Sequence, residues 1–256
     1  MKLVKLDPPG TWCLRAAFYD SLKGYEPKSF IEVGPGEGGM SMELCSLGLD
    51  GTGIDSSGLS VDRLSGNMRS FIEDGRYRII HDDAMRMNTA PRADLVFSLM
   101  VMEHIKDDLL FLDTMKSMAT EGGRVVVAVP ARMDRWGIED EIYGHFRRYE
   151  SDGLYRLMES AGFRSIRICS AGIPVSNILF SAGNFFTRKS MVSKRKGLSK
   201  SEQTDLSSMI DVAGKTMFPV YFRLVLNSYT MSPFMMIQKL FYRTNLGLTL
   251  VGSGTV

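Results

Sequence analysis

Short apolar runs alternate with longer amphipathic segments through the first 170 residues of the chain. Continuous apolar runs such as Val125-Val-Val-Ala-Val129 are typical of strands that are buried on both faces of a sheet. Strands are predicted at 29–34, 51–55, 77–81, 93–99, 123–130 and 163–169. Helices are predicted at 10–23, 38–48, 57–73, 106–119 and 150–161. This alternation predicts an α/β fold with a doubly wound, mostly parallel sheet.

The alternation stops near residue 171, where the composition shifts to Phe, Met, Ser and Lys. Apolar residues recur with helical spacing in 173–187 and again in 204–242, which predicts a helical cap over 171–243. The final run 246–251 is β-prone, so the chain is expected to return to the sheet after the cap. We therefore expect a main domain made of 1–170 and 244–256, interrupted by the cap.

A glycine turn follows the first predicted strand of the main domain, in Phe30-Ile-Glu-Val-Gly-Pro-Gly-Glu-Gly-Gly39. Gly34, Gly36 and Gly38 have no Cβ, so the backbone can take a positive φ and a ligand can lie against it. Acidic residues lie near the ends of three successive strands: Glu32, Asp55 and Asp83. Because the ends of parallel strands share one edge of the sheet, these carboxylates are expected to converge on a single nucleotide-type site.

Two kinds of cofactor compete for this turn. Gly34, Gly36 and Gly39 satisfy the G-x-G-x-x-G dinucleotide pattern, and Asp55 lies about 20 residues downstream, where a ribose-binding acid is expected. However, Glu32 and Glu37 would repel a diphosphate, whereas S-adenosylmethionine carries an ammonium and a sulfonium and no phosphate. Charge favours S-adenosylmethionine over a nicotinamide or flavin coenzyme, with a purely structural glycine turn as the third reading.

Several separated blocks match one known family. They are Glu32-x-Gly34-x-Gly36-x-Gly38, Gly53-Ile-Asp55, His81-Asp-Asp83-Ala84, Asp94-Leu-Val-Phe-Ser-Leu99 with Glu103-His104-Ile105, and Gly122-Gly-Arg-Val-Val-Val-Ala-Val-Pro130. On these blocks the chain resembles the class I S-adenosylmethionine-dependent methyltransferases. Further blocks are similar to a bacterial and archaeal type 11/12/23-like subgroup often encoded near glycan, lipid or secondary-metabolite pathways: Trp12-x-x-Arg15, Gly144-His-Phe-Arg-Arg-Tyr149, Ala161-Gly-Phe163 and Asn245-Leu-Gly-Leu-Thr-Leu250. This second resemblance names no substrate.

The resemblance implies a seven-stranded Rossmann-like methyltransferase fold, in which the run 246–251 is the last strand, pairs antiparallel with its neighbour and closes the sheet. It also implies S-adenosylmethionine as cofactor and S-adenosylhomocysteine as product. The cofactor-binding residues expected on this basis are Arg15, Glu32, Gly34, Pro35, Gly36, Gly38, Asp55, Ser56, Asp83, Ala84, Met85 and Leu99.

Each acidic residue has an expected role and a structural alternative. Glu32 is expected to accept hydrogen bonds from the methionine ammonium, directly or through water, and Asp55 from the two ribose hydroxyls. Asp83 is expected to accept the exocyclic amine of adenine, with Ala84 and Met85 against the ring. The alternative for each is a capping or turn role at the start of a helix. A metal site at 81–83 is not expected, because consecutive strand residues point to opposite faces.

Methyl transfer needs mainly positioning, and a general base only if the acceptor begins protonated. Histidine suits that role, and His104, after the fourth strand, and His145, in the loop after the fifth, are the two candidates. The alternative for His104 is a structural histidine at the start of a helix, bonded to the backbone or to Glu103.

The loop after the fifth strand is expected to face the acceptor. Tyr143, Arg147 and Arg148 are its expected substrate-binding residues, since a guanidinium grips a carboxylate or phosphate well. The alternative is that one arginine pairs with Asp140 or Glu141 to fix the loop while Tyr149 packs beneath it. For Arg15 the alternative to a cofactor contact is a surface salt bridge.

Composition limits the remaining possibilities. A formal net charge of +2 gives no long-range field that would favour nucleic acid. The three cysteines are far apart and form no C-x-x-C pair, so reduced thiols in a cytoplasmic protein are expected, without a metal site. The basic run in 188–200 follows an apolar helix and predicts either a peripheral membrane contact or a solvated loop.

A small or amphipathic acceptor methylated on oxygen, nitrogen or carbon is expected, with oxygen or nitrogen favoured by the histidines. The competing functions are a nicotinamide oxidoreductase on the same fold and a non-catalytic protein that binds S-adenosylmethionine or docks on a membrane.

Overall fold

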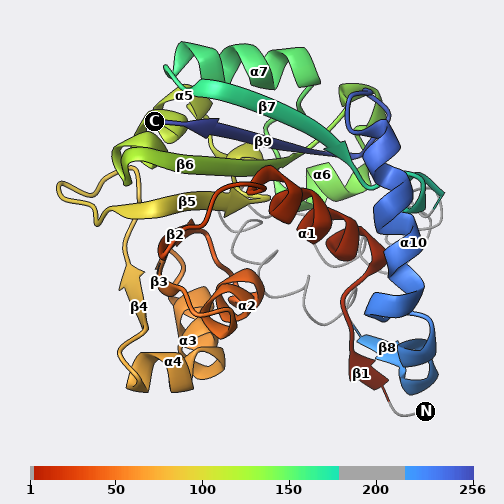
Figure 1. Ribbon diagram of the computed structural model, residues 1–256, viewed down its shortest axis with the longest axis horizontal. Helices are drawn as coiled ribbons and strands as arrows, with labels where there is room; N and C mark the ends of the chain where they lie inside the picture. Colours follow the sequence, from red (N-terminus) through yellow and green to blue (C-terminus); the bar gives the residue numbers. More distant parts are fainter. Residues whose placement is uncertain (1–2, 179–216) are drawn as a thin grey trace. The chain divides into compact units, whose positions relative to one another are not determined.

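The computed structural model describes residues 3–178 and 217–256, and these divide into two compact units. Unit 1 comprises Met1–Asp20, Pro130–Ser151 and Ile168–Val251, and unit 2 comprises Ser21–Val129, Asp152–Arg167 and Gly252–Val256 (Figure 1). The predicted division at 171–243 stays a prediction, because most of that segment lies outside the described residues.

The sheet has seven strands in the order β4-β3-β2-β5-β6-β9-β7. The strands are β2 (Ser29–Val33), β3 (Asp50–Asp55), β4 (Tyr77–His81), β5 (Ala93–Leu99), β6 (Ala119–Pro130), β7 (Arg164–Ala171) and β9 (Thr249–Thr255). The predicted α/β class and the six earlier strands are confirmed. The last strand begins at Thr249, later than the predicted 246, and it lies between β6 and β7, so β7 is the edge strand. Its antiparallel pairing stays a prediction.

Strand β2 lies at the point where the strand order reverses. It pairs in parallel with both β3 and β5, while β4 pairs in parallel with β3 and β6 with β5. From β2 the chain moves outward to β3 and β4, then crosses back to β5 and continues to β6 in the opposite direction (Figure 1). The loops that follow β2 and β5 therefore leave the carboxyl ends of these two strands in different directions. Ligands of open α/β sheets bind in the crevice at such a point.

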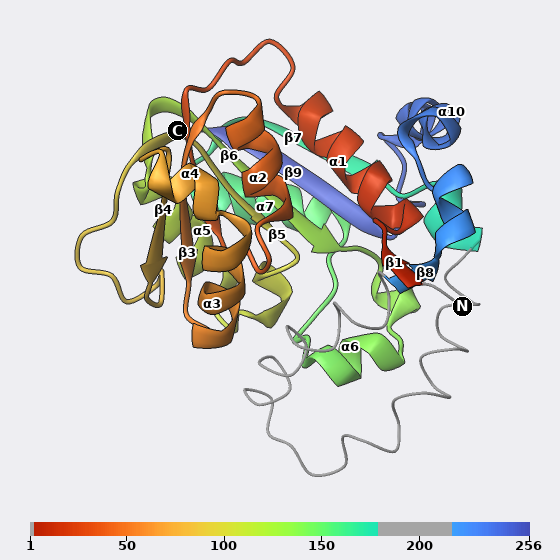
Figure 2. The ribbon, with the colours of Figure 1, turned by 90° about the horizontal axis from the view of Figure 1, so that it is seen from below.

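Helices of unit 2 begin where the sequence provides capping residues. Asp107 accepts a hydrogen bond from the Leu110 amide at 3.0 Å and starts α5 (Asp108–Ser117). The single helix predicted at 57–73 is in fact two, α3 (Gly58–Asn67) and α4 (Arg69–Glu73), because Met68 leaves helical geometry at φ −96° and ψ 7°. Helices α2 (Gly39–Ser46), α3 and α4 pack beside β3 and β4 (Figure 2). Helix α7 (Ser151–Ser160) precedes β7.

Unit 1 contains a second, two-stranded sheet in which β1 (Leu3–Lys5) pairs antiparallel with β8 (Met217–Pro219). The helix predicted over 204–242 is therefore wrong at 217–219, where pairing with a distant segment overrides local spacing. Helical structure in this region consists of η3 (Val220–Leu224), α10 (Ser228–Gln238) and η4 (Lys239–Phe241). Unit 1 also holds α1 (Pro9–Ser21), η2 (Met133–Arg135) and α6 (Ile138–Tyr143). The helix predicted at 173–187 and the basic run at 188–200 lie wholly or mostly outside the described residues.

Candidate functional site

The glycine turn at the end of β2 has the conformation that its sequence predicts. Gly34, Gly36 and Gly38 have φ values of 72°, 56° and 80°, which residues with a Cβ rarely adopt. A Cβ on Gly34 would come within 2.5 Å of Val101, so packing also requires glycine there. A Cβ on Gly36 would instead meet nothing within 4 Å, so this part of the turn faces open space. The turn is thus bare backbone that a ligand can approach, with Pro35 between its first two glycines.

Glu32 lies beneath the turn, in a buried hydrogen-bonded chain with two other side chains. The residue is 3% exposed, and its Oε2 accepts a hydrogen bond from the Ser41 hydroxyl of α2 at 2.5 Å. The Ser41 hydroxyl also lies 2.9 Å from the Tyr77 hydroxyl of β4. Because Ser41 has one proton, which it donates to Glu32, Tyr77 donates to Ser41.

Two glycines in β3 create the space that lets Tyr77 reach Ser41. In the register of the sheet, Gly51 lies between Phe30 and Tyr77, and Gly53 pairs with Glu32. A Cβ on Gly53 would collide with the Tyr77 hydroxyl, and one on Gly51 would collide with the Phe30 ring. Both aromatic side chains therefore lie across β3, with their ring centroids 6.2 Å apart. The glycines let a side chain from the edge strand β4 support an acid on the central strand β2.

Burial strongly perturbs the Glu32 carboxyl group. Desolvation is the main cause that raises its pKa to about 8, and the negative charge of Asp55 raises it further against the lowering effect of Ser41. Burial also raises the pKa of Tyr77, followed by the charge of Glu32. A buried acid with such a pKa at the carboxyl end of a central strand is the kind of group that marks functional sites.

Asp55 ends β3, next to the turn-bearing strand β2. Its Oδ1 accepts a hydrogen bond from the Ser57 amide at 2.9 Å, and Ser57 itself caps α3. Ser56 is exposed, and its carbonyl lies 3.3 Å from Nε2 of His81, so His81 ties the ends of β3 and β4 together. Ser57, rather than Asp55, therefore provides the side-chain cap of α3.

Asp83 follows β4 and takes part in a turn. Its Oδ1 accepts a hydrogen bond from the Met85 amide at 3.0 Å, and its Oδ2 lies 3.2 Å from Nε of Arg86. Ala84 is buried and Met85 is half-buried, as an apolar surface for a ring requires. The turn role considered from the sequence is therefore present, and an adenine contact would have to coexist with it.

The carboxyl end of β5 contains a strained residue. Leu99, half-buried, ends the strand, and Met100 follows with a φ of 59°, an uncommon conformation for a residue with a long side chain. The chain then forms η1 (Met102–His104), in which Glu103 is fully buried and His104 is half-buried. Backbone strain at a strand end beside the glycine turn is consistent with a functional loop.

In unit 1, the loop after β6 is organised around Asp140. This buried carboxylate accepts a hydrogen bond from the Gly137 amide at 2.8 Å, and its Oδ1 lies 2.8 Å from both Nδ1 of His145 and Nε of Arg148. Burial alone would raise the pKa of Asp140, but the hydrogen bonds from His145, Arg148 and the Gly137 amide lower it. Because an ionised carboxylate only accepts, Nδ1 of His145 carries a proton and donates it to this bond.

Arg148 also donates to the Ala131 carbonyl at 3.1 Å, so its guanidinium braces the loop against the end of β6. Tyr149 is buried and pairs with the same strand end, its amide donating to the Pro130 carbonyl at 2.9 Å. This is the arrangement of the structural alternative, with one arginine on Asp140 and Tyr149 packed beneath the loop. Tyr143 is buried with its ring centroid 6.1 Å from that of His145, whereas Arg147 is half-buried. Arg15 of α1 pairs with Asp7 at 2.7 Å.

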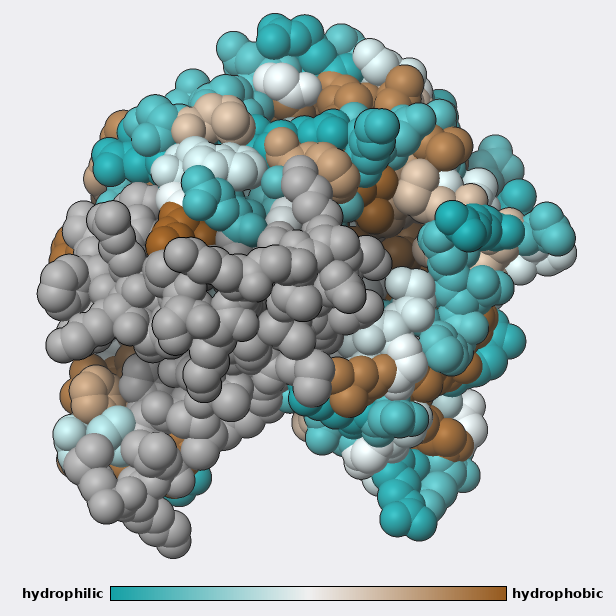
Figure 3. Space-filling model, turned by 180° about the vertical axis from the view of Figure 1, so that it is seen from behind, coloured by the Kyte–Doolittle hydropathy of each residue, from teal (hydrophilic) through white to brown (hydrophobic). Residues whose placement is uncertain are grey.

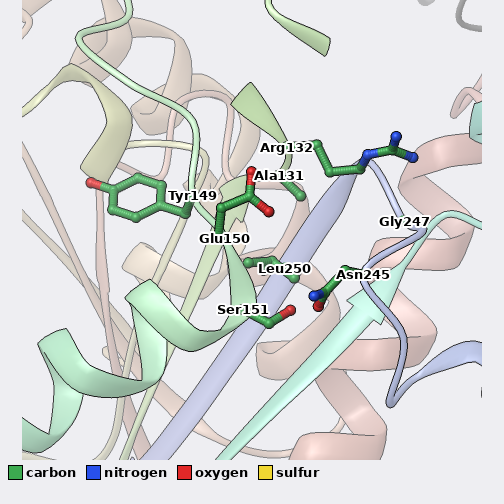
Figure 4. Close-up of a pocket in the computed structure, with 8 residues that line it drawn as sticks. All are labelled: Ala131, Arg132, Tyr149, Glu150, Ser151, Asn245, Gly247 and Leu250. Atoms are coloured by element: carbon green, nitrogen blue, oxygen red, sulfur yellow. The ribbon is translucent and has the colours of Figure 1, made fainter. Parts of the chain in front are cut away.

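A small hollow lies beside this loop within unit 1. Its empty space of about 140 Å³ includes part of the open solvent, and it is lined by Ala131, Arg132, Tyr149, Glu150, Ser151, Asn245, Gly247 and Leu250 (Figure 4). Pockets for small molecules usually have about 300 Å³ or more, so this hollow is too small for a drug-sized acceptor. The guanidinium of Arg132 points away from Glu150 in Figure 4 and forms an ion pair with Asp134 at 2.7 Å.

A family model described as a methyltransferase domain matches residues 13–168, more than half of the chain. The chain belongs to this family. The predicted membership in the class I enzymes is confirmed, and the protein is an S-adenosylmethionine-dependent methyltransferase. A search of curated proteins finds no match.

Solved structures share the fold of this methyltransferase at low identity. The segment StiE O-MT 961–1257 is 15% identical with a TM-score of 0.56, over 94% of this chain and 73% of that chain. Phosphoethanolamine N-methyltransferase 2 of Haemonchus contortus, solved with S-adenosyl-L-methionine, is 13% identical with a TM-score of 0.57, over 94% of this chain and 52% of that chain. The [4+2]-cyclase SpnF is 12% identical with a TM-score of 0.59, over 93% of this chain and 80% of that chain.

Sequence reasoning missed two members of the Glu32 chain, Ser41 and Tyr77. The signal for them was Gly51-x-Gly53, because two glycines on one face of a strand indicate that other groups approach the backbone closely. Identifying those groups requires the register of β3 against β2 and β4, which the sequence does not reveal.

Proposed function

We propose that this methyltransferase transfers the methyl group to a small or amphipathic acceptor, on oxygen or nitrogen in preference to carbon. For the cofactor side of this reaction, the observation that carries the proposal is the buried Glu32 beneath a glycine turn that is open at Gly36. A cationic, phosphate-free cofactor suits this acid, whereas a pyrophosphate would meet the charge of Asp55 and, once Glu32 is ionised, that of Glu32 as well. The cofactor supplies a methyl group that its sulfonium already activates, so the protein has mainly to position the acceptor.

In the proposed arrangement, Glu32 receives the ammonium of the cofactor, and the turn from Gly34 to Gly38 presents backbone to its amino-acid part. Asp55 and Ser56 would bind the ribose, and Ala84, Met85 and Leu99 would contact the adenosine. Asp83 would accept the adenine amine while it continues to hold the Met85 amide. Arg15 remains a candidate for the cofactor carboxylate, in competition with its ion pair to Asp7.

Two histidines remain candidates for the base that removes a proton from the acceptor. The hydrogen bond from Nδ1 of His145 to Asp140 supports His145, because it fixes the ring and leaves Nε2 as the atom that accepts a proton in the neutral form. His104 is the second candidate, from its position after β5. Tyr143 and Arg147 are the proposed acceptor contacts, and Arg148 acts chiefly by bracing the loop.

A small-molecule acceptor is supported by the nearly neutral net charge of +2, which favours no polyanion. The named structures include one O-methyltransferase segment and one N-methyltransferase, and both acceptor atoms agree with a histidine base. Calorimetric titration with S-adenosylmethionine and with NAD tests the cofactor assignment. S-adenosylmethionine is expected to bind and NAD is not, as the charges at the turn require.

The Asp55→Ala variant is expected to bind S-adenosylmethionine about tenfold more weakly or worse, since two ribose hydroxyls lose a charged acceptor. Isothermal titration calorimetry measures the change, and Asp62→Ala, at an exposed position within α3, is the control. An Asp55→Ala variant with the wild-type dissociation constant would remove Asp55 from the cofactor site.

The His145→Gln variant is expected to lower kcat by about 100-fold or more for a hydroxyl or ammonium acceptor while it leaves cofactor affinity unchanged. A screen of metabolite extracts with labelled S-adenosylmethionine supplies the acceptor. If His145→Gln keeps full turnover and His104→Gln loses it, the base is His104. If both variants keep full turnover, the acceptor needs no histidine base. Absence of labelled product from all extracts would count against a small-molecule acceptor.

A further inference from the structure

Helix α10 presents an apolar stripe to solvent. Tyr229, Met236 and Leu240 are 89%, 67% and 80% exposed, and Ile237 is also exposed. Positions 229, 236, 237 and 240 are separated by seven, one and three residues, so they lie on one side of α10 and its continuation η4. These are large side chains that a surface helix normally buries.

The opposite side of α10 fixes this orientation with a polar residue. Gln238 is fully buried, its Nε2 donates to the Cys13 carbonyl at 2.9 Å, and its Oε1 accepts from the Gly172 amide at 3.1 Å. At the start of the helix, the Asn227 side chain accepts from the amides of Tyr229 and Thr230. Rotating α10 to bury the apolar stripe would break both hydrogen bonds of Gln238. The outward apolar stripe is therefore built into unit 1.

The segment directly before α10 is also apolar and exposed. Four residues of η3 and its end are exposed although they are large and apolar, and Leu224 is 78% exposed. We call the following nine residues the α10 surface: Val220, Tyr221, Leu224, Val225, Tyr229, Phe234, Met236, Ile237 and Leu240. At the top of Figure 3, by contrast, apolar residues are interspersed with polar ones. A concentration of this kind marks an interaction surface.

The charges of the same segment indicate the kind of partner. Residues 217–256 contain three basic side chains, Arg223, Lys239 and Arg243, and no aspartate or glutamate. Lys239 forms an ion pair with Asp20 of α1 at 2.8 Å, whereas Arg223 and Arg243 are exposed beside the apolar residues in sequence. In a symmetric pair of chains the α10 surface would face its own copy, so Arg223 and Arg243 would meet the same two arginines of the other chain. An anionic lipid surface offers both an apolar layer for the stripe and phosphates for the basic residues.

The length of α10 decides how it would meet a bilayer. The helix has 11 residues, whereas a span needs about 20. In the described ranges no helix is long and apolar enough to cross a membrane. We propose that the α10 surface docks this protein on an anionic membrane, with α10 lying along the interface and Tyr229 at headgroup level.

Co-sedimentation of the full chain with vesicles tests this proposal. Wild-type protein is expected to bind phosphatidylcholine vesicles that contain phosphatidylglycerol, and to bind pure phosphatidylcholine vesicles more weakly. The double variant Met236→Glu with Leu240→Glu should lose about tenfold or more of the binding to anionic vesicles, since it places two acids on the apolar stripe. The matched control is Leu47→Glu, at a 65% exposed leucine of unit 2, which should bind as wild type does.

Thermal unfolding and cofactor affinity confirm that the double variant is folded, because both changed residues are exposed. Arg223→Gln with Arg243→Gln gives a second test and should reduce binding only to the anionic vesicles. The proposal is overturned if wild-type protein binds neither kind of vesicle, or if the double variant binds as wild type does. It is also overturned if light scattering shows a wild-type dimer that the double variant converts to monomers, because the α10 surface would then be a contact between copies.

Discussion

Replacing Asp140 by alanine is expected to lower the free energy of unfolding by about 3–5 kcal/mol, because it leaves a buried arginine without its partner. The side chains of Arg148 and His145 are 8% and 9% exposed, so water cannot replace the lost carboxylate easily. The Gly137 amide would lose its acceptor as well. Urea unfolding followed by circular dichroism measures the loss, and Glu141→Ala, at an exposed position of the same helix, is the control.

The same carboxylate makes stability depend on pH at the acid end. The pKa of Asp140 in the folded protein is lowered by its donors, so its stabilising contribution is present above the pKa of the unfolded chain. That contribution is lost as pH falls through the lower folded value. The wild type and Asp140→Asn should therefore become similar in stability only in strong acid. An Asp140→Ala variant as stable as the Glu141→Ala control would show that the cluster contributes nothing to the fold.

The sequence predicted the parts of the fold that depend on local pattern. Strands β5 and β6 contain continuous apolar runs, Leu95-Val-Phe97 and Val125-Val-Val-Ala-Val129, and the glycine turn needs positive φ values that few other residues tolerate. Pairing between distant segments was not predictable in the same way. Residues 217–219 have helical spacing but pair with β1, and the last strand inserts between β6 and β7.

The candidate site follows the same division. The positions of Glu32, Asp55 and Asp83 near strand ends follow from the apolar pattern and the right-handed connections. The direction of each side chain does not. Glu32 points into a buried chain with Ser41 and Tyr77, and Arg148 binds Asp140 within its own loop. These contacts depend on sheet register and on loop closure, neither of which has a signal in composition or spacing.

The affinity of S-adenosylmethionine is expected to rise with pH and to level off near pH 8, since burial raises the pKa of Glu32 to about 8, until the α-ammonium of the cofactor loses its own proton at higher pH. Below that pH Glu32 is largely protonated. Its carboxyl group must lose this proton before it can bind the cofactor ammonium. Binding at pH 7 should therefore be about tenfold weaker than the plateau value, since the ionised fraction falls tenfold per pH unit. Calorimetry in buffers of different ionisation enthalpy should detect about one proton released at pH 7.

The Glu32→Gln variant separates charge from shape. Glutamine can still accept the Ser41 hydrogen bond, but it carries no charge at any pH. It should bind S-adenosylmethionine about tenfold or more weakly than wild type at pH 9, approach wild type near pH 6, and release no proton. The companion variant Tyr77→Phe keeps the acid. Its cofactor affinity should therefore still depend on pH, but the midpoint of that dependence should be displaced.

The free energy of unfolding of the cofactor-free protein should fall as pH rises, whereas the cofactor affinity rises. The folded pKa of Glu32 is raised, so its contribution is complete below the unfolded value of about 4.5 and is lost as pH rises through about 8. Glu32→Gln avoids the cost of a buried charge, and its advantage over wild type should grow from pH 6 to pH 9. Cofactor affinity that does not vary with pH in the wild type, together with no proton release, would show that the ammonium does not bind at Glu32. The acid would then serve only to hold β2, α2 and β4 together.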